Sequence, residues 1–174
     1  MASTSVPASS LLQTDTVLVE SIVSAVEGCL SMCGCQAGCV GLSRVPTHEI
    51  GTVTGIIGVH GDVSGFITVN MAERVAIAAV AGLLQEPLRE LNSQVIDGVG
   101  EITNLIVGGI KKKLSASPWG FRHVTVPSVI VGRNYRIAFA GGLEFVAVTF
   151  EHRNPEAIML DERLLQVAVS LIRL

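Results

Sequence analysis

Residues 93–114 read SQVIDGVGEITNLIVGGIKKKL, and their spacing predicts a long amphipathic helix that ends before Pro118. At about 100° per residue, the apolar side chains of this helix fall on one broad face. They are Val95, Val99, Ile102, Ile106 and Ile110. A narrow stripe almost opposite carries Asp97, Glu101, Asn104 and Gly108. Because Glu101 and Asn104 are three residues apart, we expect their side chains to lie side by side in solvent.

The polar stripe has two interpretations. A glycine in an exposed helix interior costs about 1 kcal/mol relative to alanine, so Gly108 makes sense if a partner protein approaches the backbone there. The alternative is an ordinary solvated face that tolerates Gly108, with Asp97 serving as a residue favoured near a helix start. The cations of residues 111–113 suit the negative end of the helix dipole, and a basic patch for a partner is the second possibility.

An internal repeat with an offset of 81 residues relates two parts of the chain. The frame D-x3-E-x2-N-x22-P is formed by Asp97, Glu101, Asn104 and Pro127. The frame T-x3-E-x2-V-x22-P is formed by Thr16, Glu20, Val23 and Pro46. We therefore expect two related halves, residues 15–85 and 93–174, within a single domain of residues 14–174. Residues 1–13 are expected to form a loose tail.

Capping and alternation patterns predict the remaining elements. Thr14 or Asp15 caps a first helix that runs to about Met32, and Asn70, with Glu73 behind it, caps a second helix that ends near Leu84. Strands are expected at residues 39–45, 51–59, 65–69, 123–131, 135–139 and 143–150. Residues 155–164 have an ambiguous helical pattern, and residues 166–173 alternate like a strand. The fold class is α+β, with a largely antiparallel sheet packed against long helices.

Composition excludes several functional classes. The chain of 174 residues is 49% apolar and only 16% charged, yet its longest uncharged runs are too short or too rich in Gly, Ser, Cys and Gln for a membrane span. The N-terminus lacks the basic and apolar regions of a secretory signal, so we expect a cytoplasmic protein. A net charge of −3 and few aromatic residues argue against a nucleic-acid partner.

The cysteines all fall in one window, with the spacing C-x3-C-x-C-x3-C: Cys29, Cys33, Cys35 and Cys39. This spacing lacks the separated pairs of a usual zinc site. Cys29 and Cys33 lie one helical turn apart, which favours small buried side chains in the core. A thiolate metal or redox site is the alternative.

The segment Asp97-Gly-Val-Gly-Glu101-Ile-Thr-Asn104, with Pro127 after a 22-residue gap, resembles the signature of the CheC/CheX/FliY family of response-regulator phosphatases. Within that family the chain is most similar to CheX-like domains. The resemblance implies hydrolysis of the phosphoaspartate on a CheY-like receiver domain. Asn104 would orient the attacking water and Glu101 would engage a receiver lysine, with weaker docking roles for Asp97 and Gly108.

The resemblance also implies how the chain works with other molecules. The Mg²⁺ belongs to the phosphorylated receiver, so the chain itself needs no cofactor, and the chain forms a homodimer. Relatives of the CheC type carry the motif in both halves, whereas Val23 stands here at the position of Asn104. One site per chain is therefore expected. Two alternatives remain open: a non-catalytic receiver-binding or dimerisation module, and a cysteine-based sensor.

Overall fold

The computed structural model describes residues 8–44, 51–133, 135, 137, 143–154 and 156–174. Its elements in chain order are α1 (Ala8–Met32), β1 (Ala37–Ser43), β2 (Val53–Gly61), β3 (Val63–Met71), α2 (Glu73–Leu84), α3 (Ser93–Leu114), β4 (Phe121–Val124), β5 (Ser128–Val131), β6 (Glu144–His152), the 3-10 helix η1 (Asp161–Arg163) and β7 (Leu164–Arg173). The expected α+β class is confirmed. The helix predicted over residues 93–114 has the expected bounds.

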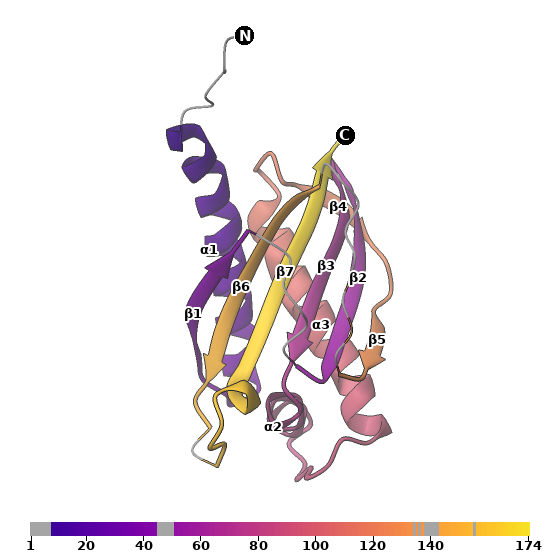
Figure 1. The fold of residues 1–174 in the computed structure, drawn as a ribbon. Coiled ribbons are helices and arrows are strands. Elements are labelled where there is room, and N and C mark those ends of the chain that lie inside the picture. Colours follow the sequence, from indigo (N-terminus) through magenta and orange to yellow (C-terminus); the bar gives the residue numbers. More distant parts are fainter. Residues whose placement is uncertain (1–7, 45–50, 134, 136, 138–142, 155) are drawn as a thin grey trace.

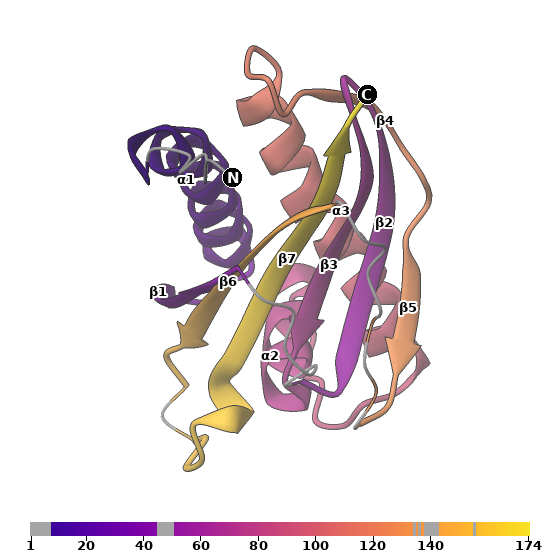
Figure 2. The same cartoon turned by 45° about the horizontal axis from the view of Figure 1, so that its top comes forward.

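The strands form one antiparallel sheet in the order β1-β6-β7-β3-β2-β4, and β5 pairs with β2 beside β4 (Figure 1). The three α-helices of the described part cover one face of this sheet (Figure 2). Strand β7 lies at the centre, between β6 and β3, so the C-terminal segment completes the sheet. The alternation seen at residues 166–173 therefore marks a central strand.

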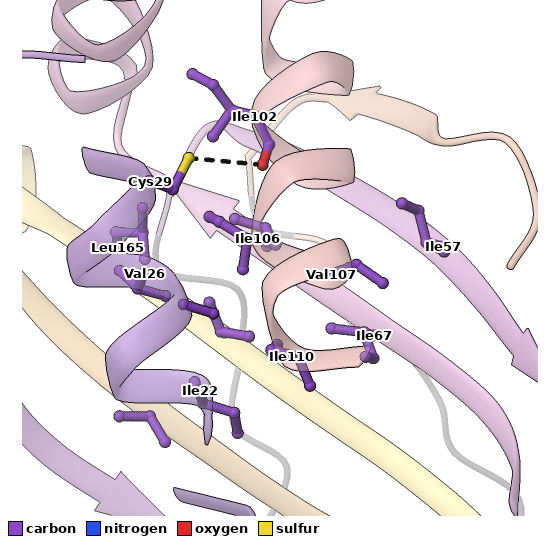
Figure 3. Packing of buried hydrophobic residues seen from close by; sticks show 14 of the residues in the cluster. Ile22, Val26, Cys29, Ile57, Ile67, Ile102, Ile106, Val107, Ile110 and Leu165 are labelled. Atoms are coloured by element: carbon purple, nitrogen blue, oxygen red, sulfur yellow. Dashed lines mark hydrogen bonds between the residues drawn. The ribbon is translucent and has the colours of Figure 1, made fainter. Parts of the chain in front are cut away.

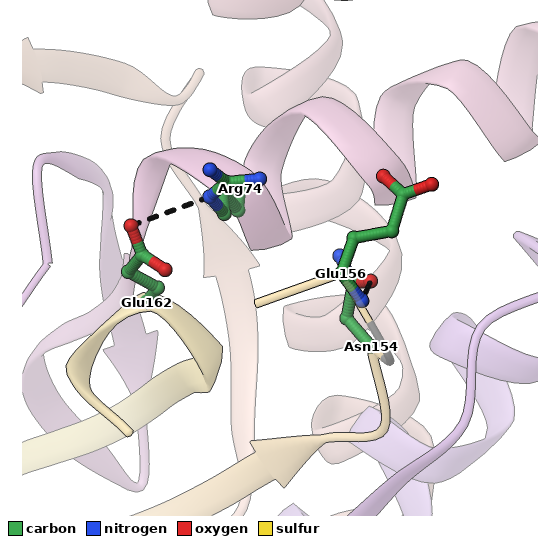
Figure 4. Close-up of polar contacts among 4 residues, drawn as sticks. All are labelled: Arg74, Asn154, Glu156 and Glu162. Carbon is green, nitrogen blue, oxygen red and sulfur yellow. Dashed lines mark hydrogen bonds and ion pairs between the residues drawn. The ribbon is translucent and has the colours of Figure 1, made fainter. Parts of the chain in front are cut away.

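The connection from β6 to β7 is attached to α2 by an ion pair and carries a hydrogen bond of its own (Figure 4). Arg74 on α2 forms an ion pair with Glu162 of η1, with 3.3 Å between Nε and Oε1. Within the same connection, the backbone N–H of Glu156 donates to Asn154 Oδ1 at 2.9 Å. Both partners of the ion pair are at least one-third exposed, so these contacts position the connection more than they stabilise the domain.

The first helix begins earlier than expected. Helix α1 starts at Ala8, not at Thr14 or Asp15, so residues 8–13 are helical and are not part of a loose tail. No glycine or proline interrupts the chain between Ala8 and Glu27, and a cap residue inside such a stretch does not stop a helix from extending further. The expected end at Met32 is confirmed.

The expectation that Asn70 caps the second helix is wrong. Asn70 lies buried near the end of β3, where its Oδ1 accepts from the Gly51 N–H and its amide donates to Thr54 Oγ1, both at 2.6 Å. Helix α2 begins after Ala72, which provides no side-chain cap. The buried hydrogen bonds across β2 and β3 outweigh the local capping pattern.

The strand expected over residues 123–131 is divided. Pro127 lies between β4 and β5 and divides the strand, because a proline has no N–H to donate to the hydrogen-bond ladder. Both short strands pair with β2. The strand expected at residues 135–139 lies largely outside the described residues, as does Pro46.

Helices α1 and α3 pack on each other and on the sheet to form one core (Figure 3). The apolar face predicted for residues 93–114 is fully buried, from Val95 to Ile110. From α1, Ile22, Val26 and Cys29 project toward α3, and the Cys29 thiol donates to the carbonyl oxygen of Ile102 at 4.0 Å. Helix α3 is thus packed against α1 and the sheet through its apolar face, and the polar stripe on the opposite face points outward.

Candidate functional site

The stripe on α3 lies at the surface, although Asn104 is less exposed than the sequence predicts. Asp97, Glu101 and Gly108 are exposed and Asn104 is half-buried. The helix that carries them is capped by Asn92, whose Oδ1 accepts from the Val95 N–H at 3.0 Å. The three lysines in its last turn complement the helix dipole. The four stripe residues therefore lie along one face of a well-terminated helix.

Close backbone packing fixes the position of α3. A Cβ added to Gly55 on β2 would collide with the Thr103 side chain, and a Cβ added to Gly98 would collide with Val80 of α2. On the α1 side, a Cβ on Gly109 would lie 3.0 Å from the Ala25 Cβ. Small residues on three sides thus let the sheet, α2 and α1 approach α3 closely. This packing fixes the position of α3 in the fold, and the helix itself sets the separation of Glu101 and Asn104.

Gly108 differs from these packed glycines. A Cβ at this position would have nothing within 4 Å. Internal packing therefore does not require a glycine here, although the residue costs about 1 kcal/mol of helix propensity relative to alanine. The bare position leaves the backbone of the stripe accessible from outside.

Neither Glu101 nor Asn104 makes a side-chain hydrogen bond or ion pair within the part of the chain that the structure describes. The neighbouring Thr103, by contrast, donates its hydroxyl to the Val99 carbonyl at 2.7 Å. A carboxylate can attract a cation, and a carboxamide offers both donors and an acceptor to a water molecule. The pair can thus anchor a positively charged group and orient a water beside it.

Two hollows border the stripe, and sequence reasoning missed both. The first, of about 780 Å³, lies between α1 and α3 and has exposed Val17, Met32 and Leu105 among its lining residues, together with Glu20. The second, of about 560 Å³, lies at the end of α3, where Gly108, Lys111 and Lys112 meet residues of other elements. Those include Asp62 and Arg122. Helical periodicity could identify the α3 residues but not these partners, because the pairing of β4 with β2 brings them there.

The four cysteines are spread from the core to the sheet edge. Cys29 and Cys33 are buried, Cys35 is half-buried and Cys39 is exposed on β1, all as free thiols. A hydrogen bond between the Cys29 and Cys33 side chains raises the pKa of Cys29 and lowers that of Cys33, while burial raises the pKa of Cys35. Among the described residues, no three His, Cys, Asp or Glu side chains are grouped so that they could hold a metal ion.

None of the described helices is long and apolar enough to cross a membrane.

Comparison with known proteins identifies relatives of this arrangement. The model of the family described as "Chemotaxis phosphatase CheX" matches residues 53–151. The chemotaxis protein CheX from Vibrio vulnificus is 23% identical, with a TM-score of 0.74 over 89% of this chain and 99% of its own. CheX from Desulfovibrio desulfuricans is 24% identical, with a TM-score of 0.72 over 88% and 98% of the two chains.

A third solved structure contains a partner. A chain of the CheX-CheY-BeF3-Mg²⁺ complex from Borrelia burgdorferi is 21% identical and has a TM-score of 0.68 over 91% of this chain and 97% of that one. At such identities these likenesses show the shared fold. A comparison with curated proteins gives no match.

Proposed function

The chain belongs to the CheX family of chemotaxis phosphatases, and from that premise we propose that it hydrolyses the phosphoaspartate of a CheY-like receiver domain. The observation that carries the proposal is the Glu101–Asn104 pair, exposed or half-buried on a rigid helix and without partners among the described residues. A protruding pair suits a protein substrate, because a deep pocket would exclude the receiver.

Asn104 is the residue proposed to orient the attacking water. An acyl phosphate has a good leaving group, so hydrolysis depends more on positioning and charge stabilisation than on a strong base. A carboxamide holds a water through its C=O or N–H without titrating in the physiological range. The close packing of α3 limits the entropy lost when this side chain enters the receiver's site.

Glu101 is proposed to anchor the receiver through a lysine. Its carboxylate stands one helical turn before Asn104 on the same stripe, so a single docking event engages both side chains. The Mg²⁺ is proposed to reside on the receiver and not on this chain. The structure of a CheX-CheY-BeF3-Mg²⁺ complex from Borrelia burgdorferi supports a CheY-like receiver as the partner.

The decisive experiment follows the loss of phosphoryl label from a cognate receiver. Wild-type protein should accelerate the decay, and Asn104→Ala should lower the catalysed rate by about 10²-fold or more, as the loss of one positioned polar group does elsewhere. Glu101→Ala should mainly weaken receiver binding. Glu20→Ala is the matched control on α1 and should leave the rate unchanged.

Two results would reject this mechanism. If Asn104→Ala accelerates decay as well as the wild type does, the amide does not orient the water. If the receiver binds but no receiver of the source cell loses its phosphoryl group faster, the chain is a receiver-binding module without turnover.

We also propose that the chain forms a homodimer. Strand β1 is an edge of the sheet and, among the described strands, pairs only with β6. Its Val40 and Leu42 side chains are more than half exposed, and exposed apolar edges favour pairing with another chain. Sedimentation equilibrium of the wild type and of Val40→Lys tests this, and a monomeric wild type at micromolar concentration would reject it.

A further inference from the structure

We propose that the hollow at the C-terminal end of α3 is a second docking site for the receiver. The hollow binds an acidic patch that lies on the receiver beside its phosphorylated aspartate. This inference rests on the proposed function and adds a surface and a partner chemistry to it. The hollow is continuous with the stripe that carries Glu101 and Asn104.

Helical spacing relates the hollow to the reaction site. Gly108 follows Asn104 by four residues, and Lys111 and Lys112 follow Gly108 by three and four, so these residues share one face of α3. At 1.5 Å rise per residue, the two lysines lie roughly 10–12 Å along the helix axis from Asn104. A receiver docked on Asn104 therefore extends over the hollow.

The charges in the hollow are only partly neutralised within the described residues. Arg122 of β4 forms an ion pair with Asp62, with 3.2 Å between Nη2 and Oδ1, and both side chains are more than half exposed. Lys111 and Lys112 have no carboxylate within ion-pairing distance in the part of the chain that the structure describes. Three cations thus surround one carboxylate in the hollow, although the whole chain has a net charge of −3.

The receiver's own chemistry makes the complementary surface. Mg²⁺ is bound through oxygen ligands, mainly carboxylates and phosphate oxygens, so the surface around a phosphorylated receiver site is anionic. Gly108 lies between Asn104 and the lysines and has nothing within 4 Å of where its Cβ would be. The receiver can therefore approach the helix backbone closely enough for its carboxylates to reach Lys111.

The alternative is that the lysines act only on the helix dipole. That role would be shared by all three lysines, because each lies in the last turn. Docking distinguishes them. Lys111 lines the hollow at the end of α3 but not the first hollow, between α1 and α3 (the α1–α3 groove). Lys113 lines the α1–α3 groove but not the hollow at the end of α3, and Lys112 lines both.

The test compares Lys111→Glu with Lys113→Glu, which have the same change in charge on the same helical turn. The probe is the receiver loaded with beryllium fluoride and Mg²⁺, and the measurement is its dissociation constant at several salt concentrations. At about 50 mM salt, Lys111→Glu should weaken binding by about 10-fold, and the loss should shrink to about 2-fold near 0.5 M because salt screens the interaction. Lys113→Glu should stay within about 2-fold of wild type throughout.

Equal losses in the two variants, or a loss that salt does not reduce, would overturn the docking site. Matching thermal midpoints for the two variants would show that folding is not the cause. The proposed function is tested separately by phosphoryl decay. If the wild type accelerates phosphoryl decay but Lys111→Glu binds the receiver as tightly as wild type, only the proposed docking site is rejected. If Lys111→Glu selectively weakens binding but the wild type does not accelerate decay, only the proposed phosphatase activity is rejected.

Discussion

Helices α1 and α3 perform the same packing role and display different surfaces. Both lie on one face of the sheet and bury an apolar face in the shared core. An offset of 81 residues aligns Thr16, Glu20, Val23 and Glu27 with Asp97, Glu101, Asn104 and Gly108, and the burial pattern of the two sets is the same: exposed, exposed, half-buried, exposed. The bounds of β3 and β6 differ by the same 81 residues, while the duplication itself stays a prediction. The fold thus offers two stripes, and only the side chains on α3 suit the proposed chemistry.

The largest expected effect tests whether the two helices are equal partners in one core. Ile22→Ala on α1 and Ile106→Ala on α3 each remove a fully buried side chain and should each lower the free energy of unfolding by about 2–5 kcal/mol. Urea titrations followed by far-UV and fluorescence signals should give coincident single transitions. A separate early transition in Ile22→Ala would instead show that α1 is a detachable element, which would break the comparison.

The second prediction exchanges the residues that distinguish the stripes. Asn104→Val gives α3 the side chain found on α1 and should reduce receiver dephosphorylation by about 10²-fold, equivalent to about 2.7 kcal/mol. Adding Val23→Asn to that variant should not restore the rate, because Glu27 occupies the position that Gly108 leaves bare. If the variant with both Asn104→Val and Val23→Asn recovers the rate while Glu27 is unchanged, a bare position is not needed for docking.

Sequence periodicity predicts α3 well because its signals are local. Asn92 caps it, its apolar face repeats over five positions, and its polar stripe follows from the same angle. The sequence alone could not predict the role of Asn70, since the partners of that amide lie 16 and 19 residues away across the β2–β3 hairpin. For the same reason it could not place Arg122 beside Lys111, which depends on the pairing of β4 with β2. Local pattern predicts which residues share a helix face, and long-range pairing determines what stands next to that face.

A third prediction compares two exposed glycines whose Cβ positions are open. Gly28 on α1 and Gly108 on α3 both have nothing within 4 Å of an added Cβ, so each replacement by alanine should stabilise the protein by up to about 1 kcal/mol. Thermal denaturation measures that gain. Only Gly108→Ala should also weaken the binding of the beryllium-fluoride receiver, by about 3-fold, because only that methyl group lies on the proposed docking face. Equal receiver affinities in the two variants would remove the functional meaning of Gly108.

The smallest effects concern how the two helices end. Helix α1 closes with Gly34 at a φ of 68°, where the Gly34 N–H bonds to the Ser31 carbonyl at 3.0 Å and the Cys35 N–H to the Leu30 carbonyl at 2.8 Å. Helix α3 has no such turn, since Ser115 keeps right-handed helical geometry. The Ser115 and Ser117 hydroxyls donate to the Lys112 and Leu114 carbonyls, both at 2.9 Å, and three lysines lie in the last turn. The end of α1 is thus stabilised by backbone conformation, and the end of α3 by serine hydroxyls and by the charge of its lysines.

Salt separates these two mechanisms. Gly34→Ala places a Cβ in the left-handed region and should cost about 1 kcal/mol at any ionic strength. Lys113→Gln should cost about 0.3 kcal/mol at low salt, at the weak end of the dipole effect because the side chain is exposed, and almost nothing near 1 M salt, where the Debye length is about 3 Å. Urea unfolding at the two salt concentrations measures both variants against wild type. If the cost of Lys113→Gln persists in high salt, its side chain stabilises α3 by packing along the α1–α3 groove, and the two helix ends are more alike than their sequences indicate.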